Sequence, residues 1–368
     1  MTEKKPFYIT TTIPYVNADP HIGFAMEIIQ ADIIARAKKL QGIEVFFSTG
    51  SDEHGQKLFE AAQKAGQTPQ DYVDFYAGKF GELKEALNLS YDNFVRTTDP
   101  YHIKAAQEMW RRCEASGDIY KKEFEGLYCV GCERFLSQRD IVDNKCHLHP
   151  WATPELLKET NWFFRLSKYQ GKILEYLKNS LVILPDWRRE EAINFVKEGL
   201  EDFSISRDKK RISWGVPVPG DDTQVMYVWF DALTNYISTL GWPDSGDFEK
   251  FWQEGHVVQA AGKDQVRFQS IMWQAMLLSA GIKNTDQVIY HGFINSGGQK
   301  MSKSLGNVIN PLKIVEAYGT DALRYFVARE FSQFEDYDVS EEQLKASYNG
   351  NLANGLGNLV SRIMTLSE

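Results

Sequence analysis

The stretch Phe7-Tyr-Ile-Thr-Thr-Thr-Ile13 decides the fold when it is taken with the residues that follow it. It is aromatic and β-branched, which is typical of a buried strand. After a polar turn, apolar residues recur at steps of three and four over Met26–Leu40, a pattern that predicts a helix packed on a sheet. Glu44–Ser48 is expected to be the next strand. A strand, a helix and a strand in this order predict a parallel, right-handed unit.

The same rhythm returns in the last third of the chain. Val257–Ala261 is expected to be a strand, Gln265–Ala280 a helix and Gln287–Tyr290 a further strand. Asn310 followed by Pro311 signals a helix start, with Asn as the cap and Pro in the first turn. The predicted fold class is therefore α/β, with a Rossmann-like parallel sheet divided between two distant parts of the sequence.

A stretch of different character separates the two halves. It is turn-rich, carries three of the four cysteines and contains helical patterns at Lys168–Lys178 and Glu190–Leu200. We interpret it as an insertion of about a hundred residues, the size of a small domain. The expected domains are the first half of the α/β domain at 1–115, the insertion at 116–225, the second half of the α/β domain at 226–325, and a last region at 326–368.

Charge and hydropathy limit the classes of function. The chain has 368 residues and a formal net charge of −9, from 41 Lys and Arg against 50 Asp and Glu. There is no overall basic character that argues for nucleic acid, so an RNA partner would need a local basic patch. No apolar run reaches the ~18 residues of a membrane span, and no signal peptide is recognisable at the start. We expect a cytoplasmic protein that does not engage a membrane.

Pro20-His21-Ile22-Gly23-Phe24 lies at the predicted strand-to-helix turn. The amino end of a helix suits a phosphate because its amide groups are unpaired and its dipole is positive there. His21 could donate to a phosphoryl oxygen, and Gly23 would let a nucleotide approach the backbone. The alternative is an ordinary helix start with a surface histidine.

Lys300-Met301-Ser302-Lys303-Ser304 is the second motif, and it follows the glycine-containing turn Asn295-Ser-Gly-Gly298. Two lysines on a mobile loop could close over a triphosphate and neutralise the charge that builds up on a leaving pyrophosphate. The alternative is a solvated basic loop.

Together the two motifs, in this order and in two halves of a parallel α/β domain, resemble the signature of the class I aminoacyl-tRNA synthetases. The usual first motif is His-Ile-Gly-His, and Phe24 replaces its last residue here. Several further stretches resemble the methionyl-tRNA synthetase family. They are Ile13-Pro-Tyr-Val-Asn17, Thr49-Gly-Ser-Asp-Glu-His-Gly55, Tyr227-Val-Trp-Phe-Asp-Ala232, Gly262-Lys-Asp264 and His291-Gly-Phe293.

The resemblance implies roles for individual residues. Asp52 is expected to hold the amino group of methionine, as a carboxylate beside an ammonium does. The implied methionine pocket consists of Ile13, Tyr15, Asp52, Trp229, Ala232, Tyr236, Phe268 and Gln269. The implied ATP site consists of His21, Gly23, Phe24, Glu27, Asp264, Lys300, Ser302 and Lys303. Catalytic roles fall to His21, Lys300, Lys303 and Arg207.

Each of these assignments has a plainer alternative. Trp229 and Tyr236 could be ordinary core, and Arg207 could form a surface ion pair. Two positions also depart from the family pattern. Gln269 stands where a histidine is usual, and Leu233 where a proline is common. Gln269 still offers an amide donor to a thioether sulfur.

The cysteines predict a metal site. Cys129-x-x-Cys132 and Cys146-x-x-His149 are two ligand pairs separated by thirteen residues. This spacing favours a structural, four-coordinate Zn²⁺, and the resembled family carries such a knuckle in its insertion. His147 is the rival fourth ligand, and Cys113 is expected to be a buried free thiol.

The predicted function is that of a methionine–tRNA ligase. Methionine would react with ATP and Mg²⁺ to form methionyl-adenylate, which is then transferred to tRNA(Met). The rivals are a class I synthetase for another amino acid and a non-catalytic relative that binds nucleotide or RNA. The family continues into a bundle that reads the anticodon, and 326–368 would hold the stem-contact region and only the first helix of that bundle. We therefore expect competent amino-acid activation, weak tRNA charging and a monomer.

Overall fold

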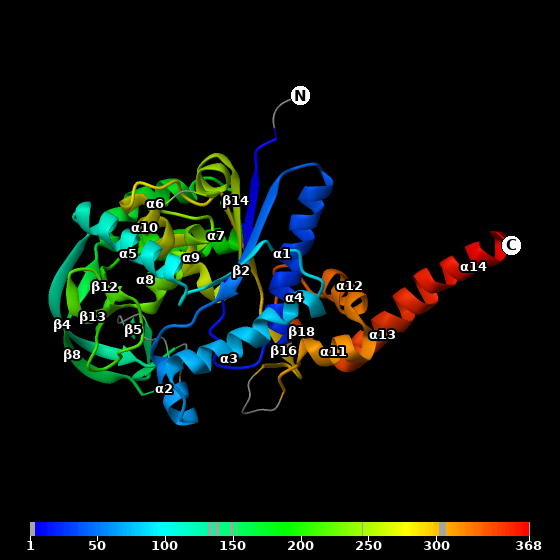
Figure 1. Cartoon of the computed structure of the whole chain (residues 1–368), viewed down its shortest axis with the longest axis horizontal. Coiled ribbons are helices and arrows are strands. Elements are labelled where there is room, and N and C mark those ends of the chain that lie inside the picture. The colour runs from blue at the N-terminus through cyan, green and yellow to red at the C-terminus, as the bar shows by residue number, and fades with distance from the viewer. Residues whose placement is uncertain are drawn as a thin grey trace.

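The computed structural model describes residues 4–131, 134–136, 140–147, 149, 151, 153–244, 246–301 and 307–367. Within these residues a six-stranded sheet forms the centre of the molecule (Figure 1). Every pair of neighbouring strands in it is parallel. Its order is β3 (Asn93–Arg96), β2 (Val45–Ser51), β1 (Phe7–Thr10), β14 (His256–Gly262), β15 (Gln287–His291) and β9 (Ile183–Leu184). The α/β class with a divided parallel sheet is therefore confirmed.

Helices cover both faces of this sheet. Successive residues of β1 point to opposite faces, so Tyr8 belongs to one apolar core, whereas Phe7 and Ile9 belong to the other. The Tyr8 core is covered by α5 (Pro100–Ala115), α6 (Gln170–Leu177), α7 (Asp186–Lys197) and α10 (Trp273–Ser279). The opposite core is covered by α1 (Ile22–Leu40), α3 (Pro69–Gly81) and α12 (Thr320–Glu330).

The strand boundaries differ from the expected ones by a few residues. Strand β1 ends at Thr10 rather than at Ile13, and β2 continues to Ser51 rather than stopping at Ser48. Residues 11–16 are still held to the sheet by single bonds, such as the one from the Thr12 amide to the Ala260 carbonyl. Helix α1 begins at Ile22, well before the first residue of its apolar stripe.

The helix expected over Gln265–Ala280 is divided into turns of different pitch. A 3₁₀ turn (Lys263–Gln265) and a π-helical segment (Phe268–Met272) precede α10. The wide π turn is accompanied by a side-chain bond of 3.0 Å from Gln274 Nε2 to the carbonyl oxygen of Gln269. Such turns occur frequently at functional sites. Periodicity alone does not reveal them, since the apolar stripe continues through them.

The insertion consists mainly of antiparallel strands. A sheet of order β10-β8-β4-β5 is built on the long pair β4 (Ile119–Cys129) and β8 (Glu155–Phe164). Its other strands are β10 (Phe203–Ser204) and β5 (Arg134–Phe135). A small pair, β6 (Ile141–Val142) and β7 (Lys145–Cys146), lies beside it. A further sheet contains β11 (Ser206–Asp208), β13 (Asp221–Met226) and β12 (Pro217–Val218).

Part of the predicted insertion belongs to the central sheet. Strand β9 pairs with β15, and Ile173, Leu177 and Val196 from the flanking helices lie in the Tyr8 core. The bounds 116–225 stay a prediction, and this segment shows that the chain returns to the sheet within them. The remaining helices near the sheet are α2 (Gln56–Ala65), α4 (Leu83–Ala86), α8 (Val228–Ala232) and α9 (Asn235–Ser238).

The last part of the chain leads away from the sheet. The strands β16 (Ile294–Ser296), β17 (Gln299–Lys300) and β18 (Tyr337–Asp338) form a small sheet of order β17-β16-β18. Helix α11 (Pro311–Tyr318) is capped by Asn310, whose side chain accepts from the Leu312 amide, as the sequence predicts. Helix α13 (Glu341–Ser347) still packs on the body through the buried Leu344. A π-helical segment (Tyr348–Gly357) then leads into α14 (Asn358–Ser367), which projects from the body (Figure 1). No helix among the described residues combines the length and apolar character needed to cross a membrane.

Asp32 connects α1 to α12 through a buried ion pair. Its Oδ1 accepts from the Ser90 amide and hydroxyl at 2.7 Å, and its Oδ2 accepts from Arg36 at 2.7 Å and from Arg324 at 2.5 Å. Burial alone would raise the pKa of Asp32, but these bonds hold the pKa below its ordinary value. The stability that they provide is thus present above the unfolded pKa of about 3.9 and is lost as the pH falls through the folded pKa.

We predict that Asp32→Asn lowers the free energy of unfolding at pH 7 by about 3 kcal/mol, because it removes the buried counter-charge of the mostly buried Arg324 and of the partly exposed Arg36. Urea denaturation followed by circular dichroism measures this, and the deficit should shrink as the pH approaches 3. The control is Asp19→Asn at an exposed pair with Lys79, which should leave the denaturation midpoint unchanged. Equal effects of the two substitutions would contradict the role of Asp32.

Candidate functional site

His21 is the N-cap of α1 at the carboxyl edge of the sheet. Its Nδ1 accepts from the Gly23 amide at 3.0 Å. In the neutral ring the proton therefore sits on Nε2, which is the donor that a phosphoryl oxygen needs. A Cβ on Gly23 would lie 2.9–3.0 Å from the His21 ring, so glycine is required for this fold-back of the imidazole.

The two motifs of the sequence lie together. The Ile22 amide donates to the Ile309 carbonyl at 2.9 Å, which joins the start of α1 to the segment after the lysine motif. Met301 packs against the same turn, since its Cε lies 3.8 Å from the position of a Cβ on Gly23. Lys300 ends strand β17, whereas Ser302 and Lys303 lie outside the described residues.

Asp52 follows β2 and is held against the segment after β1. Its amide donates to the Pro14 carbonyl at 2.9 Å, its carbonyl accepts from the Val16 amide at 3.3 Å, and Tyr15 forms a parallel bridge with it. Ile13 and Tyr15 are half-buried in this segment. The structure thus brings Ile13, Tyr15 and Asp52 together at one edge of the sheet.

The second half contributes aromatic residues that border the Tyr8 core, as Tyr15 also does. Trp229 stacks on Phe268 with ring centroids 4.0 Å apart and an interplanar angle of 13°. Tyr236 is buried against Trp273 in an edge-to-face contact, and Ala232 is buried in α8. Tyr236 therefore belongs to the core, which was the alternative to a role in a binding pocket. Trp229 and Phe268 pack against that core but remain half-exposed.

Gln269 is buried, and within the described residues its Nε2 has no hydrogen-bond partner. A buried amide donor without an acceptor lowers the stability of the folded protein. Gln269 Nε2 is therefore a candidate donor to a bound ligand.

Residues expected on the ATP side occupy different environments. Glu27 is buried, where its Oε1 accepts from the Thr12 amide and hydroxyl at 2.7 and 2.6 Å. Phe24 is buried edge-to-face on Phe80. Asp264 is exposed in the turn after β14, close to Gly262, on which a Cβ would lie 2.8 Å from its Oδ1.

His291 is a residue of this site that the motifs do not assign. Its Nε2 lies 2.7 Å from Glu27 Oε2, and its Nδ1 lies 2.8 Å from the Gly292 carbonyl oxygen. Burial disfavours the charged ring, but the bond to Glu27 and its charge raise the pKa of His291 above its ordinary value. The His291–Gly–Phe293 stretch signalled the position, although its partner Glu27 is too distant in sequence to infer.

Arg207 is buried, so it does not lie at the surface as the plainer alternative has it. Its Nη1 donates to the Ser206 carbonyl at 2.7 Å and to Ser204 Oγ at 3.0 Å. Its guanidinium lies 4.5 Å from the ring centroid of Tyr227 and 5.5 Å from that of Tyr128 in β4. This cation thus connects the insertion with the segment that leads into α8.

Two buried histidines contact the same carboxylate, that of Asp231, which lies in α8 between Trp229 and Ala232 in the sequence. His54 Nδ1 lies 2.6 Å from Asp231 Oδ2, and His102 Nε2 lies 2.8 Å from Oδ1. His54 and Asp231 each lie inside a stretch that resembles the family, but nothing in the sequence pairs them.

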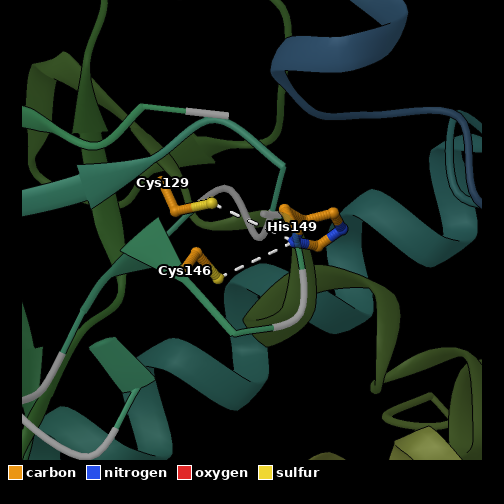
Figure 2. Close-up of side chains that lie close together, drawn as sticks. All are labelled: Cys129, Cys146 and His149. Carbon is orange, nitrogen blue, oxygen red and sulfur yellow. Dashed lines mark hydrogen bonds between the residues drawn. The ribbon is translucent and has the colours of Figure 1, made fainter. Parts of the chain in front are cut away.

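Cys129, Cys146 and His149 converge in the insertion (Figure 2). The Nδ1 of His149 lies 4.0 Å from Cys129 Sγ and 3.9 Å from Cys146 Sγ. Tetrahedral zinc would place sulfur and nitrogen ligands about 3.6 Å apart, so these residues fit a metal ion with small adjustments. A Cβ on Gly131 would lie 2.4 Å from the His149 ring, which shows how closely the turn surrounds the imidazole. Cys132 lies outside the described residues.

The structure decides between the two candidate histidines. His147 is exposed and its ring nitrogen lies 3.2 Å from the Asp140 carbonyl oxygen, so it does not join the cluster. Cys113 is a free thiol in the Tyr8 core, where burial raises its pKa to about 12. The buried free thiol is confirmed, whereas the set of metal ligands stays a prediction.

A family model described as tRNA synthetases class I (M) matches residues 7–150 and 139–364, which is most of the chain. The chain belongs to the methionyl-tRNA synthetase family. Methionine–tRNA ligase of Fusobacterium nucleatum is 45% identical over 98% of this chain and 57% of its own length. The same enzyme of Brucella suis is 44% identical over 99% of this chain and 71% of its own length. The chain thus spans between about half and three quarters of these relatives.

Solved structures agree with this membership. Mycobacterium tuberculosis methionyl-tRNA synthetase in complex with methionyl-adenylate superposes with a TM-score of 0.93 at 43% identity, over 98% of this chain and 72% of that one. Its free form gives a TM-score of 0.82 at 39% identity, over 98% of this chain and 68% of that one. The expected recognition of the family is confirmed.

Proposed function

We propose that this chain activates L-methionine with ATP to methionyl-adenylate and transfers the methionyl group to tRNA(Met). The observation that carries the proposal is the meeting of both signature segments at the edge of the sheet that holds Asp52. Ligands in open parallel sheets bind beyond the carboxyl ends of the strands. The higher TM-score with the adenylate complex than with the free relative also supports an arrangement suited to that intermediate.

The methionine end of the site follows from charge and polarizability. The Asp52 carboxylate would accept from the substrate ammonium, a charge-assisted bond. The half-exposed Trp229–Phe268 stack suits a thioether because sulfur makes favourable contacts with rings. We assign Ile13, Tyr15, Ala232 and Tyr236 to the same pocket. Gln269 Nε2, a buried donor without a partner in the described part of the chain, is assigned to the sulfur.

The ATP end follows from the start of α1. The methionine carboxylate would attack the α-phosphorus in line, with pyrophosphate leaving, a reaction that depends on positioning and charge stabilisation. His21 Nε2 would donate to a phosphoryl oxygen, while Lys300 and Lys303 approach the leaving pyrophosphate. The nucleotide would be surrounded by Gly23, Phe24, Ser302 and Asp264. Arg207 would supply a further positive charge. Mg²⁺ bound with ATP would neutralise phosphate charge.

Glu27 is assigned a positioning role within the ATP site, because its oxygens are occupied by Thr12 and His291. It would hold the segment after β1 against the end of β15, and with it the edge on which the nucleotide lies.

The reaction is tested by amino-acid-dependent exchange of pyrophosphate into ATP, measured with each of the twenty amino acids. We expect exchange with methionine only, because the aromatic and amide-lined pocket selects an unbranched thioether. Exchange with a different amino acid would contradict the substrate assignment. No exchange with any of them, from correctly folded protein, would favour a non-catalytic nucleotide- or RNA-binding relative.

Lys303→Ala should lower the rate of exchange about 10²–10³-fold, since one charged donor to the transition state is lost. The Kd for methionine, measured separately by fluorescence, should change less than about twofold. A matched control is Lys313→Ala in α11, a lysine of the same region outside the proposed site, which should leave both unchanged. An unaltered exchange rate in Lys303→Ala would remove the catalytic role.

Cys129, Cys132, Cys146 and His149 are proposed to hold a structural Zn²⁺ ion, since four protein ligands leave no open position for catalysis. We expect purified protein to contain an equimolar amount of zinc by mass spectrometry, and Cys146→Ser to lose it with a lower melting temperature. Cys113→Ala, a change at the buried free thiol, should keep the zinc. Full zinc content in Cys146→Ser would refute the ligand set.

A further inference from the structure

Asp231 is a carboxylate buried in the interior, and within the described part of the chain its ion pairs are with histidines and not with a lysine or an arginine. Its side chain is 1% exposed, and its oxygens face two imidazoles that are almost as deeply buried. Because an ionised carboxylate only accepts, His54 Nδ1 and His102 Nε2 must both carry a proton toward it. Burial alone would raise the pKa of Asp231, but the charge of His54 and the bonds from both histidines hold it below its ordinary value.

The two histidines approach Asp231 from different parts of the fold. His54 follows Asp52 by two residues, and its amide lies 3.4 Å from Asp52 Oδ1. His102 comes from α5, and its Nδ1 lies 2.9 Å from Ser238 Oγ in α9. The bond of His54 therefore reaches the loop that carries the proposed ammonium ligand, whereas the bond of His102 stays among helices behind α8.

Other contacts hold the loop that carries His54 in place. The Glu53 amide donates to Thr97 Oγ1 at 2.9 Å, and Trp214 Nε1 donates to the Glu53 carbonyl at 2.6 Å. The His54 ring also meets the Trp214 ring edge-on, with centroids 5.5 Å apart. The 2.6 Å bond between His54 and Asp231 thus ties the position of this loop to that of α8.

We propose that His54 is a positioning residue that sets the distance between Asp52 and the stacked rings of Trp229 and Phe268. This distance determines the length of the amino-acid side chain that the site accepts. Asp231 lies in α8 two residues after Trp229 and next to Ala232, so the 2.6 Å bond joins the two ends of the amino-acid site. This inference depends on the proposed function, because it assigns the ammonium to Asp52 and the thioether to the stacked rings.

The test compares His54→Ala with His102→Ala, since each removes an imidazole from the same carboxylate. Pyrophosphate exchange gives kcat and KM for methionine and for ATP, and norvaline and ethionine serve as shorter and longer analogues. For His54→Ala we expect the KM for methionine to rise about tenfold or more, as for a lost bond to a charged group. The KM for ATP should change less than about twofold, and the preference for methionine over both analogues should fall.

His102→Ala should lower the melting temperature but leave the KM for methionine within about twofold of wild type. His54→Asn places an amide donor near the position of Nδ1 and should recover most of the methionine affinity. If His54→Ala leaves the KM for methionine and the preference unchanged, or if both alanine variants change them equally, the proposal is overturned and Asp231 is a purely structural centre.

Variants that fold poorly are compared at equal amounts of native protein, with His54→Asn as the well-folded member of the series. Exchange by the wild-type chain establishes the proposed function independently of these variants. A wild-type chain that neither catalyses exchange nor binds methionine in a fluorescence titration would overturn the function and this inference together. Exchange by wild type with unaltered variants would overturn only the inference.

Discussion

The parallel pairing of β1 with β14 is the contact on which the rest of the structure depends. It places Phe7 opposite His256 and Thr10 opposite Gln259, so the two halves of the sequence become neighbours in one sheet. Because both strands run in the same direction, the segments that follow them emerge at the same edge. Glu27 thereby meets both Thr12 and His291, and Ile22 meets Ile309.

The insertion supports this edge instead of forming a detached module. Arg267, the residue before Phe268, donates to the buried Asp140 beside the Cys/His cluster at 3.0 Å. On the other side Tyr128 of β4 contacts the guanidinium of Arg207 and donates to Gln56 at 3.3 Å. The Cys/His cluster thus lies between two contacts: one reaches Arg267, next to Phe268, and the other reaches Gln56 in α2, the helix after Asp52.

Much of the fold was predictable because short-range patterns specify it. Three local patterns each predict a local structure: the aromatic residues from Phe7 a strand, Asn310 a helix cap, and the Cys/His spacing a cluster. The structure contains the strand, the cap and the cluster of Cys129, Cys146 and His149. Resemblance identified Asp52, Trp229 and Phe268; the structure holds Asp52 against the segment after β1 and stacks Trp229 on Phe268, and their shared role stays a prediction. The partners of Glu27 and Asp231 could not be predicted, since a bond between residues 264 or 177 positions apart leaves no periodic trace. The π turn at Phe268 and strand β9 were missed for the same reason, because tertiary contacts decide them.

The order of the strands also has a consequence for synthesis of the chain. Strand β2 is made soon after β1, but β14, the other neighbour of β1, follows some two hundred residues later. At ~5–20 residues per second the ribosome needs on the order of tens of seconds to supply it. During that time the central strand has an unpaired edge, and the apolar side chain of Tyr8 has not met Trp252. The nascent protein therefore passes through a long interval in which its most buried strand is the one that most needs protection from aggregation.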